Sequence, residues 1–358
     1  MSYYDKLNEA IKNSLSDRDL QYQLLYFDEI VKLAIMIINN TPRLEFESYT
    51  TDVSLNTSID NAINFFNEIK PEYAYMLENI LREVGTYKGK KDYSVRFFRI
   101  SEERQRMDPM VGNNSHVKTD GFVHIDYSNT LDDTFSLVHE ITHKFSQPKN
   151  QDSTIKQFLG ETSTISMEFL LEDYLLKNTN YDNREVLIQK NNRLATTYDD
   201  ALALLFENIL LKLYKQNNNC ITKEILLNYL NSMDKNSRIY ELFLERGERY
   251  LNDIVNKGCL QFYKRQRYVI GVVLASYFHN KIKNDKEMIN VLCYLIDILG
   301  HTDFLAEEDL RILSNLDIPI VKHGNLSISE DDIITLIDCY RNEVSDVMAY
   351  QNKNSKKA

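Results

Sequence analysis

The stretch from Leu137 to Phe145 reads Leu-Val-His-Glu-Ile-Thr-His-Lys-Phe, and it decides how the rest of the chain is interpreted. On an α-helix, residues four positions apart lie one turn apart on the same face. His139 and His143 can therefore offer two imidazoles to one metal ion, with Glu140 beside them. Apolar residues at helical spacing within and before this stretch predict a helix, and a proline a few residues later predicts its end.

The spacing His-Glu-x-x-His is typical of zinc metallopeptidases, in which both histidines bind the ion and the glutamate acts as the general base. We therefore predict that His139 and His143 bind one zinc ion and that Glu140 is the catalytic base. The alternative is that two ordinary histidines lie on an amphipathic helix. The chain contains only seven histidines in 358 residues, so a chance match to the pattern is uncommon.

A catalytic zinc ion needs a third protein ligand and an open position for water. No third histidine follows closely, but a second helix is predicted from about residue 153 to 177. Glu161 in that helix is the predicted third ligand, with a solvated helix charge as the alternative. Glu168 lies seven residues later on nearly the same face, where it can accept the N–H of a ligand histidine. Gly160 is expected to let the two helices approach closely near the metal.

Composition and charge exclude several classes of protein. The formal net charge is −11 and no basic stripe dominates, which argues against nucleic acid as a partner. No apolar run is long enough to span a membrane. The four cysteines are widely spaced and the N-terminus lacks an apolar signal region, so we expect reduced thiols and a cytoplasmic location. The oligomeric state is not indicated.

Few turns are marked, since the chain has only ten glycines and five prolines, and this favours long helices. Residues 3–40 are predicted to form one or two helices, and residues 58–85 a further helical region interrupted near Pro71. Two short segments rich in β-forming residues, 94–100 and 122–127, are predicted strands just before the zinc helix. An exposed strand edge there could bind an extended peptide by β-augmentation.

These elements predict a mainly α fold with a small β-sheet beside the active-site helix, and the length of the chain suggests one large domain or two lobes. We expect an N-terminal helical lobe over residues 1–90. A catalytic zinc metallopeptidase domain would cover residues 91–358, and the two lobes are not expected to be independent.

Four further residues are candidates for contact with substrate. Peptide hydrolysis builds an oxyanion, which a tyrosine hydroxyl can stabilise, and Tyr268 is the preferred donor. Gly271, three residues later, is expected to leave room for a substrate backbone. Tyr263 and His279 are the other candidates from this segment, and aromatic packing is the alternative for each. His124 on the second predicted strand could touch substrate or metal, or could simply lie on the strand surface.

Three segments together resemble the family of thimet oligopeptidase and oligoendopeptidase F, within the gluzincin zinc metallopeptidases. The first is the His-Glu-x-x-His stretch. The second runs from Glu161 to Glu168 and is similar to that family's Glu-x-Pro-Ser-x-x-x-Glu segment, with Ser163 in place of the proline. The third pairs Phe262-Tyr263 with Tyr268-Val-Ile-Gly271. The resemblance covers roughly residues 94–282.

The resemblance implies a mostly helical, two-lobed peptidase whose deep cleft admits short peptides and excludes folded proteins. Peptide is then the expected substrate, hydrolysed by Glu-assisted attack of a zinc-bound water. Two other functions remain open from the sequence. One is a peptide-binding or interaction protein that retains zinc without catalysis. The other is a protease that cuts one partner protein.

Overall fold

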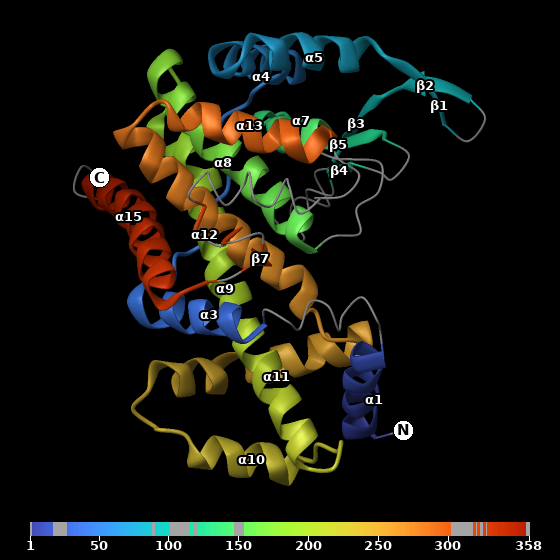
Figure 1. Cartoon of the computed structure of the whole chain (residues 1–358), viewed down its shortest axis with the longest axis vertical. Coiled ribbons are helices and arrows are strands. Elements are labelled where there is room, and N and C mark those ends of the chain that lie inside the picture. The colour runs from blue at the N-terminus through green and yellow to red at the C-terminus, as the bar shows by residue number, and fades with distance from the viewer. Residues whose placement is uncertain are drawn as a thin grey trace. The chain divides into compact units, whose positions relative to one another are not determined.

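The computed structural model describes residues 2–16, 27–87, 90–100, 115–117, 121–146, 154–301, 318–319, 321–322, 325–326 and 328–355. The described chain is mainly helical with one small three-stranded sheet and two short strand pairs, so the predicted fold class is confirmed (Figure 1). None of the described helices is both long and apolar enough to cross a membrane.

The chain forms two compact units, each built from segments that are distant in sequence. Unit 1 contains residues 1–43 and 195–270, and unit 2 contains residues 44–194 and 271–358. The boundary predicted between the two lobes, at residue 90, falls inside unit 2. The division of the chain into those two lobes stays a prediction.

Unit 1 is helical. Its complete helices are α1 (Tyr3–Ser16), α3 (Phe27–Asn40), α10 (Lys223–Ser232) and α11 (Arg238–Lys257). It also holds most of α9 (Asn183–Gln216) and the first part of α12 (Phe262–Asn284). A half-buried ion pair supports its packing, because the carboxylate of Asp200 in α9 lies 3.1 Å from a guanidinium nitrogen of Arg265 in α12.

Unit 2 holds the predicted zinc helix and the sheet. Its complete helices are α4 (Leu55–Ile69), α5 (Pro71–Arg82), α7 (Asp132–Ser146), α8 (Thr154–Asn178), α13 (Met288–His301) and α15 (Glu330–Ser355). Its strands are β1 (Val84–Tyr87), β2 (Lys90–Tyr93), β3 (Val95–Arg99), β4 (His116–Val117), β5 (Val123–Tyr127), β6 (Val321–Lys322) and β7 (Asn325–Leu326). The predicted interruption near Pro71 is confirmed, since that proline opens α5.

The three-stranded sheet has the order β3–β5–β4, with β3 parallel to β5 and β4 antiparallel to it. β3 and β5 are the two strands predicted from the sequence. β5 is the central strand of the three, so the described edges that could accept an added peptide strand belong to β3 and β4.

Helix α7 lies in the core of unit 2, in contact with α4, α8, α13 and β5 (Figure 1). Because neighbours cover it on several sides, most of its residues are buried, polar ones included. Its start is fixed by Asp133, whose carboxylate accepts the backbone N–H groups of Ser128 and Asn129, both at 2.8 Å. The carboxylate of Asp133 thus reaches back past Thr130 and ties the preceding residues to the first turn of the helix.

Candidate metal centre

The two histidines of the zinc pattern lie one turn apart in α7, and both are largely buried. Their rings are 4.7 Å apart between centroids and nearly perpendicular, with an interplanar angle of 82°. The exposed fraction of the side chain is 10% for His139 and 16% for His143. A buried imidazole that is not charged is a good metal ligand, because its nitrogen lone pair is directed and poorly hydrated.

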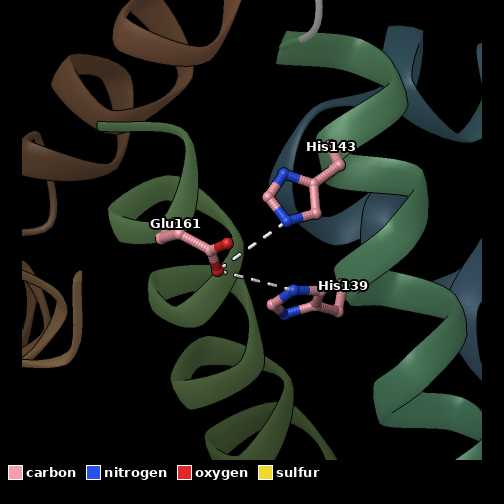
Figure 2. A group of neighbouring side chains, drawn as sticks. All are labelled: His139, His143 and Glu161. Atoms are coloured by element: carbon pink, nitrogen blue, oxygen red, sulfur yellow. Dashed lines mark ion pairs between the residues drawn. The ribbon is translucent and has the colours of Figure 1, made fainter. Parts of the chain in front are cut away.

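Glu161 from α8 completes a group of three possible ligands. Its Oε2 lies 3.9 Å from Nε2 of His139 and 3.8 Å from Nε2 of His143 (Figure 2). One ligand atom from each of the three residues lies within 4.8 Å of the other two, so this group could hold a metal ion. Helices α7 and α8 pack directly against each other, which brings together residues from two separate helices.

Glu168 contacts the opposite edge of the His139 ring. Its Oε1 lies 2.7 Å from Nδ1 of His139, so Nδ1 carries a hydrogen and donates it to Glu168, while Nε2 on the other side of the ring faces Glu161. Burial alone would raise the pKa of Glu168, but the charges of Arg193 and His139 and their hydrogen bonds lower it to about 2. Glu168 is therefore an ionised acceptor for Nδ1–H of His139, and its role beside a bound metal stays a prediction.

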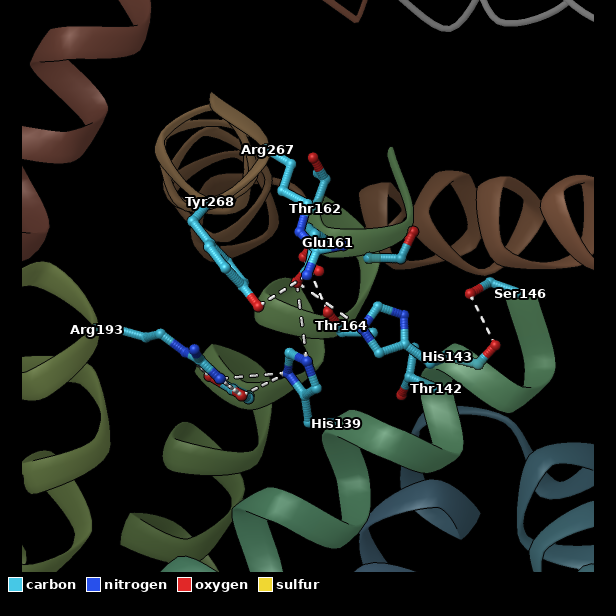
Figure 3. A network of polar contacts seen from close by, with 12 residues as sticks. His139, Thr142, His143, Ser146, Glu161, Thr162, Thr164, Arg193, Arg267 and Tyr268 are labelled. Atoms are coloured by element: carbon cyan, nitrogen blue, oxygen red, sulfur yellow. Dashed lines mark hydrogen bonds and ion pairs between the residues drawn. The ribbon is translucent and has the colours of Figure 1, made fainter. Parts of the chain in front are cut away.

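Arg193 in α9 is the residue of this centre that the sequence analysis missed. Its Nε lies 2.9 Å from Oε2 of Glu168, and its Nη2 lies 2.5 Å from Oε1. Figure 3 shows Arg193 beside His139. Arg193 is far from the other site residues in sequence, in the next helix. Charged residues in the middle of adjacent predicted helices were the available signal, since α8 carries Glu168 and Glu172 and α9 carries Lys190 and Arg193.

Glu140 lies between the two histidines in α7 and is also buried. Burial raises the pKa of Glu140, and the carboxylates of Glu161 and Glu168 add to the rise, while His139 and Arg193 oppose it, giving a value of about 7. A carboxyl group with a pKa near neutrality can both take up and release a proton under cellular conditions. A bound divalent cation would lower this pKa, because a nearby positive charge favours the carboxylate.

The structure corrects the expectations for two glycines. Gly160 has open space on the side where a Cβ would point, so it does not mediate the close helix contact. The close approach involves another pair of helices, α12 and α8, because a Cβ built at Gly271 of α12 would lie 2.9 Å from Cβ of Glu161 and 3.3 Å from Cδ1 of Ile165. The room at Gly271 is thus taken up by the third ligand's own helix, where the sequence analysis expected a substrate backbone.

The remaining predicted residues lie elsewhere. His124 in β5 pairs with Asp126 at 2.8 Å, and its ring stacks on Phe98 with centroids 4.3 Å apart. His279 in α12 has Nδ1 at 2.6 Å from Glu343 and Nε2 at 3.0 Å from Asp173. Both ring nitrogens of His279 are therefore engaged within a buried ion network.

The two tyrosine candidates both belong to the part of α12 in unit 1. The oxygen of Tyr268 accepts an Arg267 N–H at 3.1 Å, and the guanidinium lies 4.9 Å from the ring centroid. The side chain of Tyr263 lies outside the described residues. The predicted contact of either tyrosine with substrate stays a prediction.

Comparison with known proteins adds one structural likeness. No protein-family model matches the sequence, and no curated protein matches it either. The fold resembles the crystal structure of a proposed peptidase from Chlamydophila abortus, with a TM-score of 0.52 and 18% sequence identity. The match covers 97% of this chain and 55% of that chain, so this chain spans about half the length of its structural neighbour. At this identity the likeness concerns the fold.

Proposed function

We propose that the protein is a zinc-dependent metallopeptidase that hydrolyses short peptides, a short relative of the thimet oligopeptidase and oligoendopeptidase F enzymes. The observation that carries the proposal is the buried group formed by His139, His143 and Glu161, with Glu140 in the same helix as the histidines. The structural neighbour, itself described as a proposed peptidase, supports the same class of activity.

The donor set suits zinc. Two imidazole nitrogens and one carboxylate oxygen are the ligands of a catalytic gluzincin-type site, and they leave a fourth position for water. When bound, zinc lowers the pKa of that water and polarises the carbonyl of the scissile bond. Glu168 holds His139 in the tautomer that presents Nε2 to the ion, and burial keeps competing water away from the ligands.

Glu140 moves the proton. It accepts a proton from the attacking water as the water oxygen bonds to the scissile carbonyl carbon. It then delivers that proton to the amine nitrogen as the carbon–nitrogen bond breaks.

Replacing Glu140 separates zinc binding from peptide cleavage. Glu140→Gln keeps the size of the side chain but cannot accept the proton, so we expect stoichiometric zinc and a loss of peptide cleavage of at least about a hundredfold. Mass-spectrometric profiling of a diverse peptide library with both proteins measures cleavage, and elemental analysis measures zinc. A Glu140→Gln protein as active as the wild type would refute the role of Glu140.

Glu161→Ala is the comparison variant, because it should lose zinc and cleavage together. The library experiment also tests the other two functions left open by the sequence. Stoichiometric zinc in a wild-type protein that cuts no peptide would indicate a binding protein. Cleavage of a single folded protein, with all short peptides left intact, would indicate a protease dedicated to one partner.

A further inference from the structure

Arg193 and Glu168 face each other across a helical hairpin. Helix α8 ends at Asn178 and α9 begins at Asn183, so the two helices run in opposite directions within unit 2. One turn further from the metal ligands, Glu172 of α8 meets Lys190 of α9, with 2.5 Å between Oε1 and Nζ. Two consecutive ion pairs therefore hold α8 and α9 in register beside the candidate metal centre.

Arg193 engages both oxygens of Glu168. Its Nε donates to Oε2 at 2.9 Å and its Nη2 donates to Oε1 at 2.5 Å, in the two-point geometry that only a guanidinium offers. Oε1 also accepts Nδ1–H of His139 at 2.7 Å. The carboxylate group is thus held at both oxygens and cannot rotate without losing a charged hydrogen bond.

The action of Arg193 on His139 is indirect. Nη2 of Arg193 lies 3.4 Å from Nδ1 of His139. When Nε2 of His139 binds a metal, Nδ1 carries a hydrogen, so both atoms are donors and no hydrogen bond joins them. Arg193 also lies on the side of the ring away from Nε2, where it cannot touch the reacting atoms. The hydrogen bonds by which Arg193 can orient His139 therefore pass through Glu168, whereas its charge also acts directly on His139 and Glu140.

We propose that Arg193 is a positioning residue of the metal centre, which sets the orientation of His139 by clamping Glu168 and thereby strengthens zinc binding. This inference rests on the proposed zinc site. Partners of a ligand histidine typically contribute ten- to a hundredfold in metal affinity. Arg193 acts one contact further out, so we expect a contribution of about tenfold.

The test measures the zinc dissociation constant by competition with a chromophoric chelator. Arg193→Met should raise that constant about tenfold, and Arg193→Lys should raise it less, because a lysine keeps the charge but makes a single contact. The matched control is Arg184→Met, in the same helix. Arg184 also pairs with a carboxylate, that of Glu47 at 3.0 Å, but its side chain is 67% exposed and remote from the ligands. The control should bind zinc as the wild type does.

A double-variant cycle separates positioning from general destabilisation. In a Glu168→Gln background, Arg193→Met should change the zinc dissociation constant by less than about twofold, because its route to His139 is already lost. A purely structural role would give additive effects. The visible spectrum of the cobalt-substituted protein provides a second readout, since a reoriented His139 changes the absorption of Arg193→Met but not of Arg184→Met. Thermal unfolding with excess chelator records the stability of each metal-free variant.

The outcomes distinguish this inference from the proposed function. A wild-type protein that binds no zinc overturns the proposed function and this inference with it. A wild-type protein that binds zinc, with Arg193→Met and Arg193→Lys both within twofold of its dissociation constant, overturns the inference alone. If Arg193→Met does not fold, the zinc dissociation constant of Arg193→Lys decides the matter. A raised constant supports the inference, and a constant within twofold of the wild type overturns it.

Discussion

At the scale of single residues, the candidate centre is defined by which atom of each side chain is already engaged. His139 has Nδ1 bound to Glu168, which directs Nε2 toward Glu161. His279 has both nitrogens bound to carboxylates, so neither is left to donate to a substrate oxyanion. Each of these two histidines lies within a predicted helix, so the sequence alone does not distinguish them. Their hydrogen-bond partners decide which ring nitrogen can contact a metal ion or a substrate.

Among the candidates, Tyr268 remains the residue we expect to donate to the oxyanion. It precedes Gly271 by three positions in α12, and residues three apart lie on one side of a helix. Arg267 donates to its oxygen at 3.1 Å, and a hydroxyl that accepts from a cation becomes a stronger donor itself. Tyr268→Phe should lower the turnover number by roughly ten- to a thousandfold and leave zinc bound. A turnover number within about twofold of the wild type would show that another group supplies the donor.

At the scale of elements, helical contacts set the position of the third ligand. The periodicity of the sequence was enough to predict α7 and α8 and the two strands β3 and β5. It could not predict which glycine lies at the contact with Glu161, because that depends on how α12 packs against α8. The sequence analysis chose Gly160 for its proximity in sequence, whereas the packing selects Gly271.

Two single-methyl substitutions test this contact. Gly271→Ala would place a Cβ 2.9 Å from Cβ of Glu161, so α8 and α12 must separate, which overpacking data suggest costs about 1–3 kcal/mol. Displacing Glu161 should also weaken zinc binding. Gly160→Ala adds the same methyl beside the same ligand but into open space, and should raise the free energy of unfolding by up to about 1 kcal/mol.

Chemical denaturation of both variants measures the free energy of unfolding, and chelator competition measures the zinc affinity. Equal stability and equal zinc affinity in Gly271→Ala and the wild type would mean that the contact between α12 and Glu161 does not set the ligand's position.

At the scale of the whole molecule, the sequence could indicate the two histidines of the candidate metal centre and the carboxylates of α8, because these lie within two neighbouring helices. It could not indicate partners that come from distant segments. The buried network around His279 is the example. That network joins α8, α9, α12 and α15, whose residues are brought together only by the tertiary fold. Similarly, the discontinuous units of the chain have no marker such as a linker in the sequence.

The network predicts a dependence of stability on pH. Burial and the Lys190 ammonium lower the pKa of His279, but the carboxylates of Glu343 and Asp173 raise it further, so the net shift is upward. Both ring nitrogens lie within hydrogen-bond distance of a carboxylate, and only the imidazolium can donate to both. Glu172 also interacts electrostatically with His279, and its carboxylate is paired with Lys190. The folded protein therefore favours the protonated form of His279.

Because the pKa of His279 is higher in the folded state than its ordinary value of 6.5, its contribution to stability is complete below about pH 6.5. That contribution is lost as the pH rises through the raised pKa. We expect the free energy of unfolding of the wild type to fall over this range, and to fall less steeply in His279→Gln, which has no proton to lose. Denaturant unfolding at several pH values measures both slopes, and an NMR titration of the His279 ring gives its pKa directly. Parallel slopes in the two proteins would show that His279 does not carry this dependence.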